Sequence, residues 1–241
     1  MTKPDLEVGS SISANRGRWS FGGEVAQTFV PHITQSVPLY EKGHEIVCDL
    51  SDFFLRSDSR CYELGTSTGE LMGKLASHHR GLQGVSFIGV DNEQPMIEAA
   101  KQSLAGDPRI DLRVDDIVFM DFEPADLIIS YYTVQFIHPK FRQDLIDRIY
   151  RALNWGGGFL IFEKVRGPDA RFQDIQTTLY NKFKRNQGFS DSEILNKSFS
   201  LSGVLEPFSS RANLEMFERA GFSDVMPVFR WLCFEGYLCI R

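Results

Sequence analysis

The chain has 241 residues, of which 42% are hydrophobic and 24% are charged, and its formal net charge at pH 7 is −6. These values are typical of a globular protein with a sizeable core, and the acidic balance argues against broad contact with nucleic acid, which needs clustered Lys and Arg. No run of 18 apolar residues occurs, and the first residues are charged where a signal peptide needs an apolar segment. We therefore expect a cytoplasmic protein without a membrane segment. Its partner is expected to be a small-molecule substrate rather than a nucleic acid.

The amino-terminal part divides into a polar segment and a helical segment. Residues 1–18 carry Gly and Ser among polar side chains, so we expect them to be flexible. In residues 19–55, apolar side chains recur at helical spacing on both sides of a break at Pro38, which predicts a helical flank in front of the core. Tyr40 follows this break, where such a flank would cross a ligand, and it is a candidate binding residue.

Residues 61–69 predict a strand, a tight turn and the start of a helix. Gly65 allows the backbone to turn sharply and to approach a ligand, and Gly69 allows the following helix to pack against the strand. The pattern differs from a dinucleotide fingerprint, because the acidic residue Glu63 precedes the turn and Ser67 replaces the second glycine. A carboxylate here repels a pyrophosphate, but it attracts an adenosine that carries a cationic amino-acid tail.

A second acid, Asp91, follows the next apolar strand, where a carboxylate can take both ribose hydroxyls of an adenosine. The pattern E-x-G-x-S-x-G followed by V-D resembles the class I S-adenosylmethionine (SAM)-dependent methyltransferases. This resemblance implies SAM as the cofactor. It also implies that Asp116 and Ile117, which follow the third strand, contact the adenine.

The rest of the chain continues as alternating strands and helices, which predicts a parallel sheet with right-handed crossovers. After residue 166 the alternation stops, and 168–212 predicts a helical lid inserted after the fifth strand. The expected strands are 60–64, 85–90, 111–114, 126–132, 159–162, 225–231 and 232–240, and the expected helices are 70–78, 95–104, 141–153, 172–185, 191–201 and 214–220. We predict a single SAM-binding domain over 19–241 with the α/β, Rossmann-like class I methyltransferase fold, built on a mostly parallel seven-stranded sheet.

Several further motifs resemble the carboxy-S-adenosyl-L-methionine (carboxy-SAM) synthase family. They are Trp19-Ser-Phe, Gln35-Ser-Val-Pro38 followed by Tyr40, Asp91-Asn92 with Pro95-Met-Ile97, Thr133-Val-Gln-Phe136, Leu153-Asn-Trp-Gly-Gly157, and Phe183-Lys-Arg185 with Gly188-Phe-Ser190. The likeness runs from about Trp19 to the end of the chain. It implies an enzyme that makes carboxy-SAM from SAM and prephenate, and it suggests a homodimer.

The resemblance also assigns cofactor-binding residues. The family's SAM contacts fall on Tyr40, Gly65, Thr66, Ser67, Asp91, Asn92, Asp116 and Ile117, and to these we add Glu63 and Tyr131 as candidates. Two positions depart from the family: Tyr131 stands where the family has Asn, and Ser198 follows Lys197 where the family has the Arg that holds the transferred carboxylate. Binding a carboxylate in a dry pocket without that bidentate partner costs on the order of several kcal/mol. We therefore expect a relative of the synthase that catalyses a different reaction.

The catalytic candidates are Tyr131, His138 and Tyr180. SAM is activated by its own positive sulfur, so the enzyme must hold it, place a nucleophile and exclude water. Tyr131 offers an aromatic ring to the cation, His138 a base after the central strand, and Tyr180 an aromatic side chain from the lid. Glu163, at the end of the fifth strand, is a second possible base. One of Tyr131 and its neighbour Tyr132 is expected to be buried packing, since successive strand residues face opposite sides.

No metal site is predicted. The four cysteines lack C-x-x-C spacing and stand in apolar surroundings, so they are expected to be buried thiols. The adjacent pair His78-His79 has the spacing of a solvated helix end rather than of a metal site.

Three reactions remain open. The first, which we favour, is methyl transfer to a small, secondary-metabolite acceptor. The second is carboxy-SAM synthesis, which requires that another cation replace the missing Arg; Arg211 and Lys197 are the candidates, although neither stands at the motif position. The third is a non-methylating cyclisation of SAM to azetidine-2-carboxylate and methylthioadenosine, which suits an aromatic pocket without substrate-binding charges. A subunit that only binds a partner is disfavoured, because the glycine turn and both ribose-side acids are intact.

Overall fold

The computed structural model describes residues 6–7, 13–14 and 25–241, with side chains from residue 29 onward. Most of the segment predicted to be flexible, 1–18, lies outside the described residues, as does the Trp19 motif. Within that segment, β1 (Leu6–Glu7) and β2 (Ser13–Ala14) form a two-stranded antiparallel sheet, so these residues are paired rather than loose.

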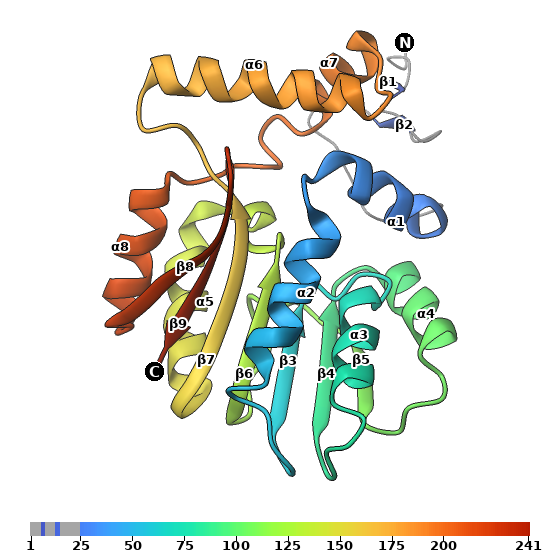
Figure 1. The fold of residues 1–241 in the computed structure, drawn as a ribbon, viewed down its shortest axis with the longest axis vertical. Coiled ribbons are helices and arrows are strands. Elements are labelled where there is room, and N and C mark those ends of the chain that lie inside the picture. The colour runs from blue at the N-terminus through green and yellow to red at the C-terminus, as the bar shows by residue number, and fades with distance from the viewer. Residues whose placement is uncertain (1–5, 8–12, 15–24) are drawn as a thin grey trace.

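The core of the protein is a seven-stranded sheet with the strand order β5-β4-β3-β6-β7-β9-β8 (Figure 1). Neighbouring strands are parallel except at β9, which runs antiparallel to both β7 and β8. The strands are β3 (Arg60–Leu64), β4 (Ser86–Asp91), β5 (Ile110–Val114), β6 (Ala125–Tyr131), β7 (Leu153–Lys164), β8 (Asp224–Trp231) and β9 (Phe234–Ile240). The predicted fold class, with its mostly parallel seven-stranded sheet, is confirmed.

The order of the strands creates a crevice at the centre of the sheet. From β3 the chain moves outward through β4 to β5, and it then returns to β6 on the other side of β3. The carboxyl ends of β3 and β6 therefore lie side by side, where Leu64 pairs with Ser130, while the segments that follow them diverge. Ligands of open α/β sheets bind at such a switch point.

Alternate residues of the central strands face opposite sides of the sheet and build two apolar layers. On β6, Leu127 and Ile129 pack toward one layer, while Ile128 packs with Tyr62 of β3 in the other. The covering helices are α2 (Tyr40–Ser51) and α3 (Glu70–His78) on the first face, α5 (Pro139–Ala152) and α8 (Ser210–Ala220) on the second, and α4 (Gln94–Ser103) against β5. Because both faces are covered, the apolar residues at 127–129 of β6 are all fully buried.

Three helices, α1 (Val25–Ser36), α6 (Ala170–Asn186) and α7 (Asp191–Ser200), lie beyond the carboxyl edge of the sheet (Figure 1). Helices α6 and α7 occur within a few residues of the two lid helices that the sequence predicts. The lid segment ends earlier than expected, because Ser209 accepts a hydrogen bond from the Ala212 amide and starts α8 there. None of the helices in the described part of the chain is both long and apolar enough to cross a membrane.

Two strand boundaries differ from the prediction for reasons that are not local. Strand β6 ends at Tyr131, because Tyr132 has a φ of 62°, a left-handed conformation that does not continue a strand; a single 3₁₀ turn, η1 (Val134–Phe136), follows. Strand β7 begins at Leu153 instead of residue 159. Leu153 pairs with Ala125, and the glycines after it exchange backbone hydrogen bonds with Arg241, so the stretch between the expected helix and the expected strand joins the sheet.

Candidate active site

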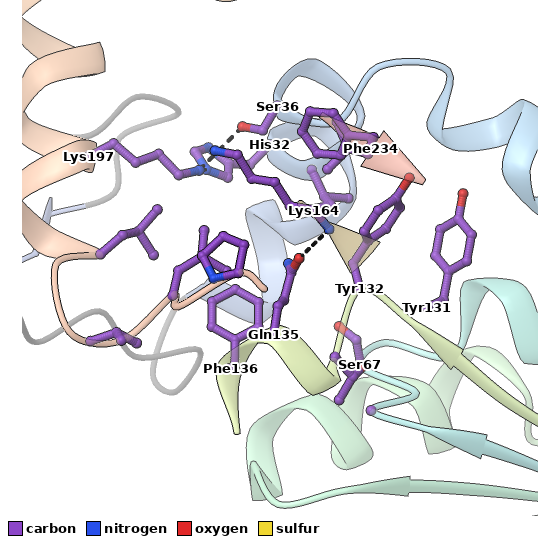
Figure 2. Close-up of a pocket in the computed structure, with 18 of the residues that line it drawn as sticks. His32, Ser36, Ser67, Tyr131, Tyr132, Gln135, Phe136, Lys164, Lys197 and Phe234 are labelled. Atoms are coloured by element: carbon purple, nitrogen blue, oxygen red, sulfur yellow. Dashed lines mark hydrogen bonds between the residues drawn. The ribbon is translucent and has the colours of Figure 1, made fainter. Parts of the chain in front are cut away.

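A cavity of about 1280 Å³ opens at the carboxyl edge of the sheet, beneath the lid (Figure 2). Its walls come from the ends of β3, β4, β6 and β7, and from α1, α2, α6 and α7. Typical small-molecule sites measure roughly 300–1,000 Å³. The cavity is therefore large enough for a nucleoside ligand and a second small molecule beside it. All ten predicted cofactor residues line it: Tyr40, Glu63, Gly65, Thr66, Ser67, Asp91, Asn92, Asp116, Ile117 and Tyr131.

The glycine turn after β3 forms one wall of this cavity. Gly65 has a φ of 77°, and a Cβ at this position would collide with the Thr133 side chain, so only glycine fits. Ser67, which replaces the second glycine of the dinucleotide pattern, has a φ of 52°, a left-handed conformation that is uncommon for a residue other than glycine. Its amide donates a hydrogen bond of 2.9 Å to Asp91 Oδ2, which ties the turn to the end of β4.

The Asp91 carboxylate is held in a fixed position at the end of β4. Its Oδ1 accepts from the Glu93 amide at 2.9 Å and its Oδ2 from the Ser67 amide, which fixes the carboxylate while leaving further lone pairs on both oxygens. Burial raises the pKa of Asp91, and three backbone amides oppose this rise. A fixed carboxylate with spare acceptor capacity fits the two hydroxyls of an adenosine.

Glu63 lies at the bottom of the turn and is only 3% exposed. Its Oε2 accepts a hydrogen bond of 2.6 Å from Thr66 Oγ1, and burial raises the pKa of Glu63 to about 8. The nearby Asp91 carboxylate raises it further. A cation bound in the cavity would stabilise the charged form of Glu63, so this residue fits a ligand with a cationic amino-acid tail.

Tyr131 forms an aromatic wall with Tyr40 and His44. The Tyr131 hydroxyl donates a hydrogen bond of 2.6 Å to the Tyr40 carbonyl, and the two rings meet edge to face with centroids 5.3 Å apart. The His44 ring lies 4.7 Å from Tyr131, and burial lowers the pKa of His44 to about 3, so it is neutral. Because the Tyr131 hydroxyl is engaged, this residue offers a ring face to a cation rather than a proton to a substrate.

Tyr132 is buried in the apolar core, as expected for one of the two tyrosines, and it also lines the cavity. Tyr132 is 6% exposed and packs against Phe162. Its ring also packs against Tyr131 and Phe234 (Figure 2). The hydroxyl has no hydrogen-bond partner among the residues that the structure describes. A buried hydroxyl without a partner is costly, and a bound water, ion or ligand in the cavity would satisfy it. The left-handed backbone of Tyr132 is also strained, which is typical of functional sites.

Three lysines from three different elements line the lid side of the cavity, and we call Lys164, Lys184 and Lys197 the lysine pocket. The ammonium groups of Lys164 and Lys184 lie 4.4 and 4.5 Å from the centre of the Tyr180 ring. Lys197 contacts His32 and lies 3.3 Å from Ser36 Oγ. In Figure 2, Lys164 and Lys197 reach toward His32 from opposite sides.

The charges of the lysine pocket oppose one another. Among the described residues, neither Lys164 nor Lys184 forms a salt bridge with a carboxylate. Burial and the neighbouring ammonium of Lys164 lower the pKa of Lys184 to about 7, and burial with both neighbours lowers the pKa of Lys197 well below its usual range. An anion in the cavity would remove this repulsion, so the pocket is suited to a small carboxylate.

Tyr180, a catalytic candidate from the sequence, lies in the cavity but holds its position through its hydroxyl. That hydroxyl donates a hydrogen bond of 2.8 Å to the Ser36 carbonyl and so connects α6 to α1. Burial raises the pKa of Tyr180, so the hydroxyl keeps its proton. The ring supports Lys164 and Lys184 by cation–π contact.

The structure contradicts His138 as a catalytic residue. Its side chain is exposed outside the cavity, and its Nδ1 accepts a hydrogen bond of 3.2 Å from the Lys140 amide, which caps the start of α5. Glu163 is buried outside the cavity lining, so its carboxyl does not face a substrate in the cavity. Burial raises its pKa to about 8. The sequence placed both residues near the strand ends but could not give the direction of their side chains.

Three cavity residues were not predicted as substrate-binding residues, namely Tyr132, Lys164 and Lys184, whereas Lys197 was named as a possible replacement for the missing Arg and does line the cavity. Arg211, the other named replacement, lies outside the cavity lining. Lys164, Lys184 and Lys197 are far apart in the chain, and each stands in an ordinary helix or strand pattern. The only available signal was the missing family Arg at Ser198, which called for a replacement cation. Ser198, which stands at the position of the missing Arg, lines the same cavity as the three lysines.

Comparison with known proteins agrees with this geometry. A family model described as a methyltransferase domain matches residues 62–157. The carboxy-S-adenosyl-L-methionine synthase of Staphylococcus epidermidis is 33% identical over 231 residues, which cover 95% of this chain and 100% of that protein. The synthase of the same name from Nitratiruptor is 36% identical over 225 residues, with 93% of each chain covered.

Solved structures share the fold at low sequence identity. Human N-acetylserotonin methyltransferase in complex with SAM has a TM-score of 0.59 at 18% identity, with 90% of this chain and 55% of that chain covered. A putative O-methyltransferase from Nostoc punctiforme has a TM-score of 0.63 at 15% identity, with 90% and 61% covered. This chain thus spans little more than half the length of those structures, and the likeness to them establishes the fold alone.

Proposed function

Because this chain belongs to the carboxy-S-adenosyl-L-methionine synthase family, we propose that it is a SAM-dependent transferase whose second substrate is a small carboxylate. SAM supplies a carbon attached to a positive sulfur, which is reactive without a metal or a nucleophilic side chain. The protein then has to hold SAM, bind the second substrate beside the sulfur and keep water out.

The two halves of the cavity have different chemistry, which supports this division of roles. Asp91, Asn92, Asp116 and Ile117 would hold the adenosine of SAM. Glu63 and the turn at 65–67 would hold its amino-acid tail, with Tyr40 and Tyr131 as the aromatic wall for the sulfonium. The lysine pocket and the Tyr132 hydroxyl lie in the other half, under the lid.

The lysine pocket is the observation that carries the proposal. A true synthase lacking the family Arg needs another cation for the transferred carboxylate, and the lysine pocket offers positive charge in the same cavity as Ser198. We therefore propose carboxy-SAM formation as the first candidate reaction, with prephenate as the carboxyl donor implied by the family. Methyl transfer to a carboxylate-bearing acceptor is the second candidate. The cyclisation hypothesis called for a pocket without substrate-binding charges, and this cavity does not match that premise.

Product analysis distinguishes these reactions. Purified protein incubated with SAM and prephenate is expected to yield carboxy-SAM by mass spectrometry, and neither SAM alone nor prephenate alone is expected to yield it. Formation of S-adenosylhomocysteine only with an added carboxylate acceptor would support the methyl-transfer candidate instead. Methylthioadenosine together with a cyclic amino acid from SAM alone would contradict the need for a second substrate.

We expect the affinity of the lysine pocket for a carboxylate to fall as the pH rises through about 7, the pKa to which burial and Lys164 lower that of Lys184. An anion binds the protonated ammonium, so above that pH binding must take up a proton, and each further pH unit weakens it by up to about tenfold. Calorimetric titration of malonate between pH 6 and 9, in buffers of different ionisation enthalpy, measures both effects. Lys184→Met should remove the dependence in this window, and a wild-type affinity independent of pH would contradict the assignment.

We further propose a homodimer through α6. Phe172, Ile175 and Leu179 recur on one side of this helix and are 50%, 48% and 46% exposed, an apolar surface that a second copy of the chain would cover. Ile175→Glu is expected to convert a dimer to a monomer in sedimentation velocity. The same substitution at Met226, an equally exposed apolar residue on β8, is the control and should leave the dimer intact. A monomeric wild-type protein would contradict the proposal.

A cytoplasmic location is also proposed. All four cysteines, Cys48, Cys61, Cys233 and Cys239, are buried free thiols, which suits a reducing compartment.

A further inference from the structure

A second group of chemically active side chains lies at the far end of α2 and α3 from the cavity. Asp52 directly follows the last residue of α2, His78 is the last residue of α3, and His79 follows it. One atom from each, a carboxylate oxygen and two imidazole nitrogens, lies within 4.8 Å of the others. Asp52 Oδ1 is 2.9 Å from His78 Nε2 and 3.9 Å from His79 Nδ1. The sequence predicted only a solvated helix end here, because the third group comes from a different helix.

Hydrogen bonding on the other side of His79 determines its tautomer. Ser51 Oγ is 2.6 Å from the Cys48 carbonyl and 2.6 Å from His79 Nε2. A carbonyl cannot donate, so the hydroxyl hydrogen must go to Cys48, and the contact with His79 is then a hydrogen bond only if Nε2 carries the proton. The Nδ1 of a neutral His79 therefore has a lone pair, and this lone pair faces the Asp52 carboxylate.

This arrangement places two acceptors against each other. A hydrogen bond from His78 to Asp52 accounts for the 2.9 Å contact but leaves His79 Nδ1 without a donor among the described residues. A metal ion between the three groups would satisfy all of them. A backbone-anchored group that holds the second nitrogen of a ligating histidine is the usual support of metal sites, and Ser51 with the Cys48 carbonyl supplies it here.

The electrostatics of the surrounding structure agree with a cation. Helices α2 and α3 both have their carboxyl ends at this cluster. The carboxyl end of a helix dipole is negative, so both helices favour a positive charge here. Arg109 binds the His79 and Ala76 carbonyls at 2.7 Å each, but its own charge is compensated by Asp107. His79 is 5% exposed, His78 32% and Asp52 58%, so a metal can enter from solvent while one ligand is held rigidly.

We propose that Asp52, His78 and His79 bind one divalent transition-metal ion, and that Zn²⁺ fits best. Two imidazole nitrogens and one carboxylate oxygen form a donor set typical of zinc, and ligand atoms around tetrahedral zinc lie about 3.3 Å apart, between the two distances found here. Solvent supplies the fourth position. The ion joins the ends of α2 and α3, whose opposite ends carry Tyr40 and Glu70 at the cavity, so it acts as a clamp on that wall. This site is independent of the proposed transferase reaction.

The test is a calorimetric titration of the chelator-treated full-length protein with ZnCl₂, together with the visible spectrum of the Co²⁺-loaded protein. We expect one Zn²⁺ per chain, an intense tetrahedral Co²⁺ band, and a higher melting temperature with metal. Asp52→Ala and His78→Ala, both at exposed positions, should each weaken binding by more than about tenfold. His138→Ala, which removes an exposed histidine elsewhere, is the matched control and should bind as the wild type does.

Two outcomes would overturn this site. One is the absence of stoichiometric Zn²⁺ binding by wild-type protein that is folded by circular dichroism. The other is Zn²⁺ binding that survives unchanged in both Asp52→Ala and His78→Ala, which would place the metal at other histidines such as His32 or His44. Neither outcome bears on carboxylate turnover, so the transferase proposal stands or fails separately.

Discussion

Replacing both Lys164 and Lys184 by Met is expected to lower kcat/KM for the carboxylate substrate by more than about 100-fold. Each charge-assisted hydrogen bond to an anion contributes roughly 1.5–3 kcal/mol, so two of them account for a factor of at least about 100. The affinity for SAM, measured by calorimetry, should change less than about threefold, because neither lysine lies in the half of the cavity assigned to SAM.

The control for this double variant is Lys182→Met, an exposed lysine on the same helix that is not part of the cavity lining. Its kcat/KM should match the wild type. If the double variant retains full turnover, the lysine pocket does not bind the substrate, and the proposed carboxylate recognition is wrong.

Stability separates loss of function from loss of fold in this experiment. Burial lowers the pKa of Lys184 in the folded state to about 7, below its unfolded value of about 10.5, so between these pH values the unfolded chain binds more protons. The free energy of unfolding should therefore rise with pH across this window. Removing the two charges at pH 7 should raise the melting temperature, and an inactive variant that melts higher than wild type has not lost activity by unfolding.

Asp91→Ala is expected to weaken SAM binding by at least about 100-fold. The substitution removes the acceptor for both ribose hydroxyls, at roughly 1.5–3 kcal/mol for each hydrogen bond to a charged group. It also leaves the Ser67 and Glu93 amides without their acceptor, which loosens the turn that carries Gly65. Calorimetric titration with SAM measures the effect.

Asp121→Ala is a suitable comparison, because Asp121 is exposed and lies outside the cavity lining. It should bind SAM with wild-type affinity. An Asp91→Ala protein that binds SAM within about threefold of wild type would show that the ribose lies elsewhere, and the assignment of the adenosine half would have to be abandoned.

Elements with local signals were predicted almost to the residue. The helix expected over 70–78 is observed as Glu70–His78, because its apolar spacing and the preceding Gly69 are both local features. Strand β7 was predicted too short, since its first residues owe their strand conformation to Ala125 and Arg241, which are distant in the chain. The end of β6 was predicted one residue too late, at Tyr132. The backbone of Tyr132 is left-handed, which the residue type tyrosine does not predict.

The candidate site shows the same division. The glycine turn and the acid at the end of β4 could be predicted because they belong to a short motif with specific residues at fixed spacing. These residues line one cavity in the structure. His138 was wrong because a histidine after a strand can face the crevice or cap the next helix. Here Pro139 begins α5, so His138 becomes the cap.

The sequence by itself determined the class of fold and brought out the turn and strand-end acids that line one side of the cavity, because such motifs depend on residues that are neighbours in the chain. Only the tertiary structure decided the other half. The lysine pocket exists because α6 and α7 fold back over the end of β7, and the Asp52, His78 and His79 cluster exists because two helices end at the same place. Both groupings depend on packing between distant segments, which no spacing along the chain records.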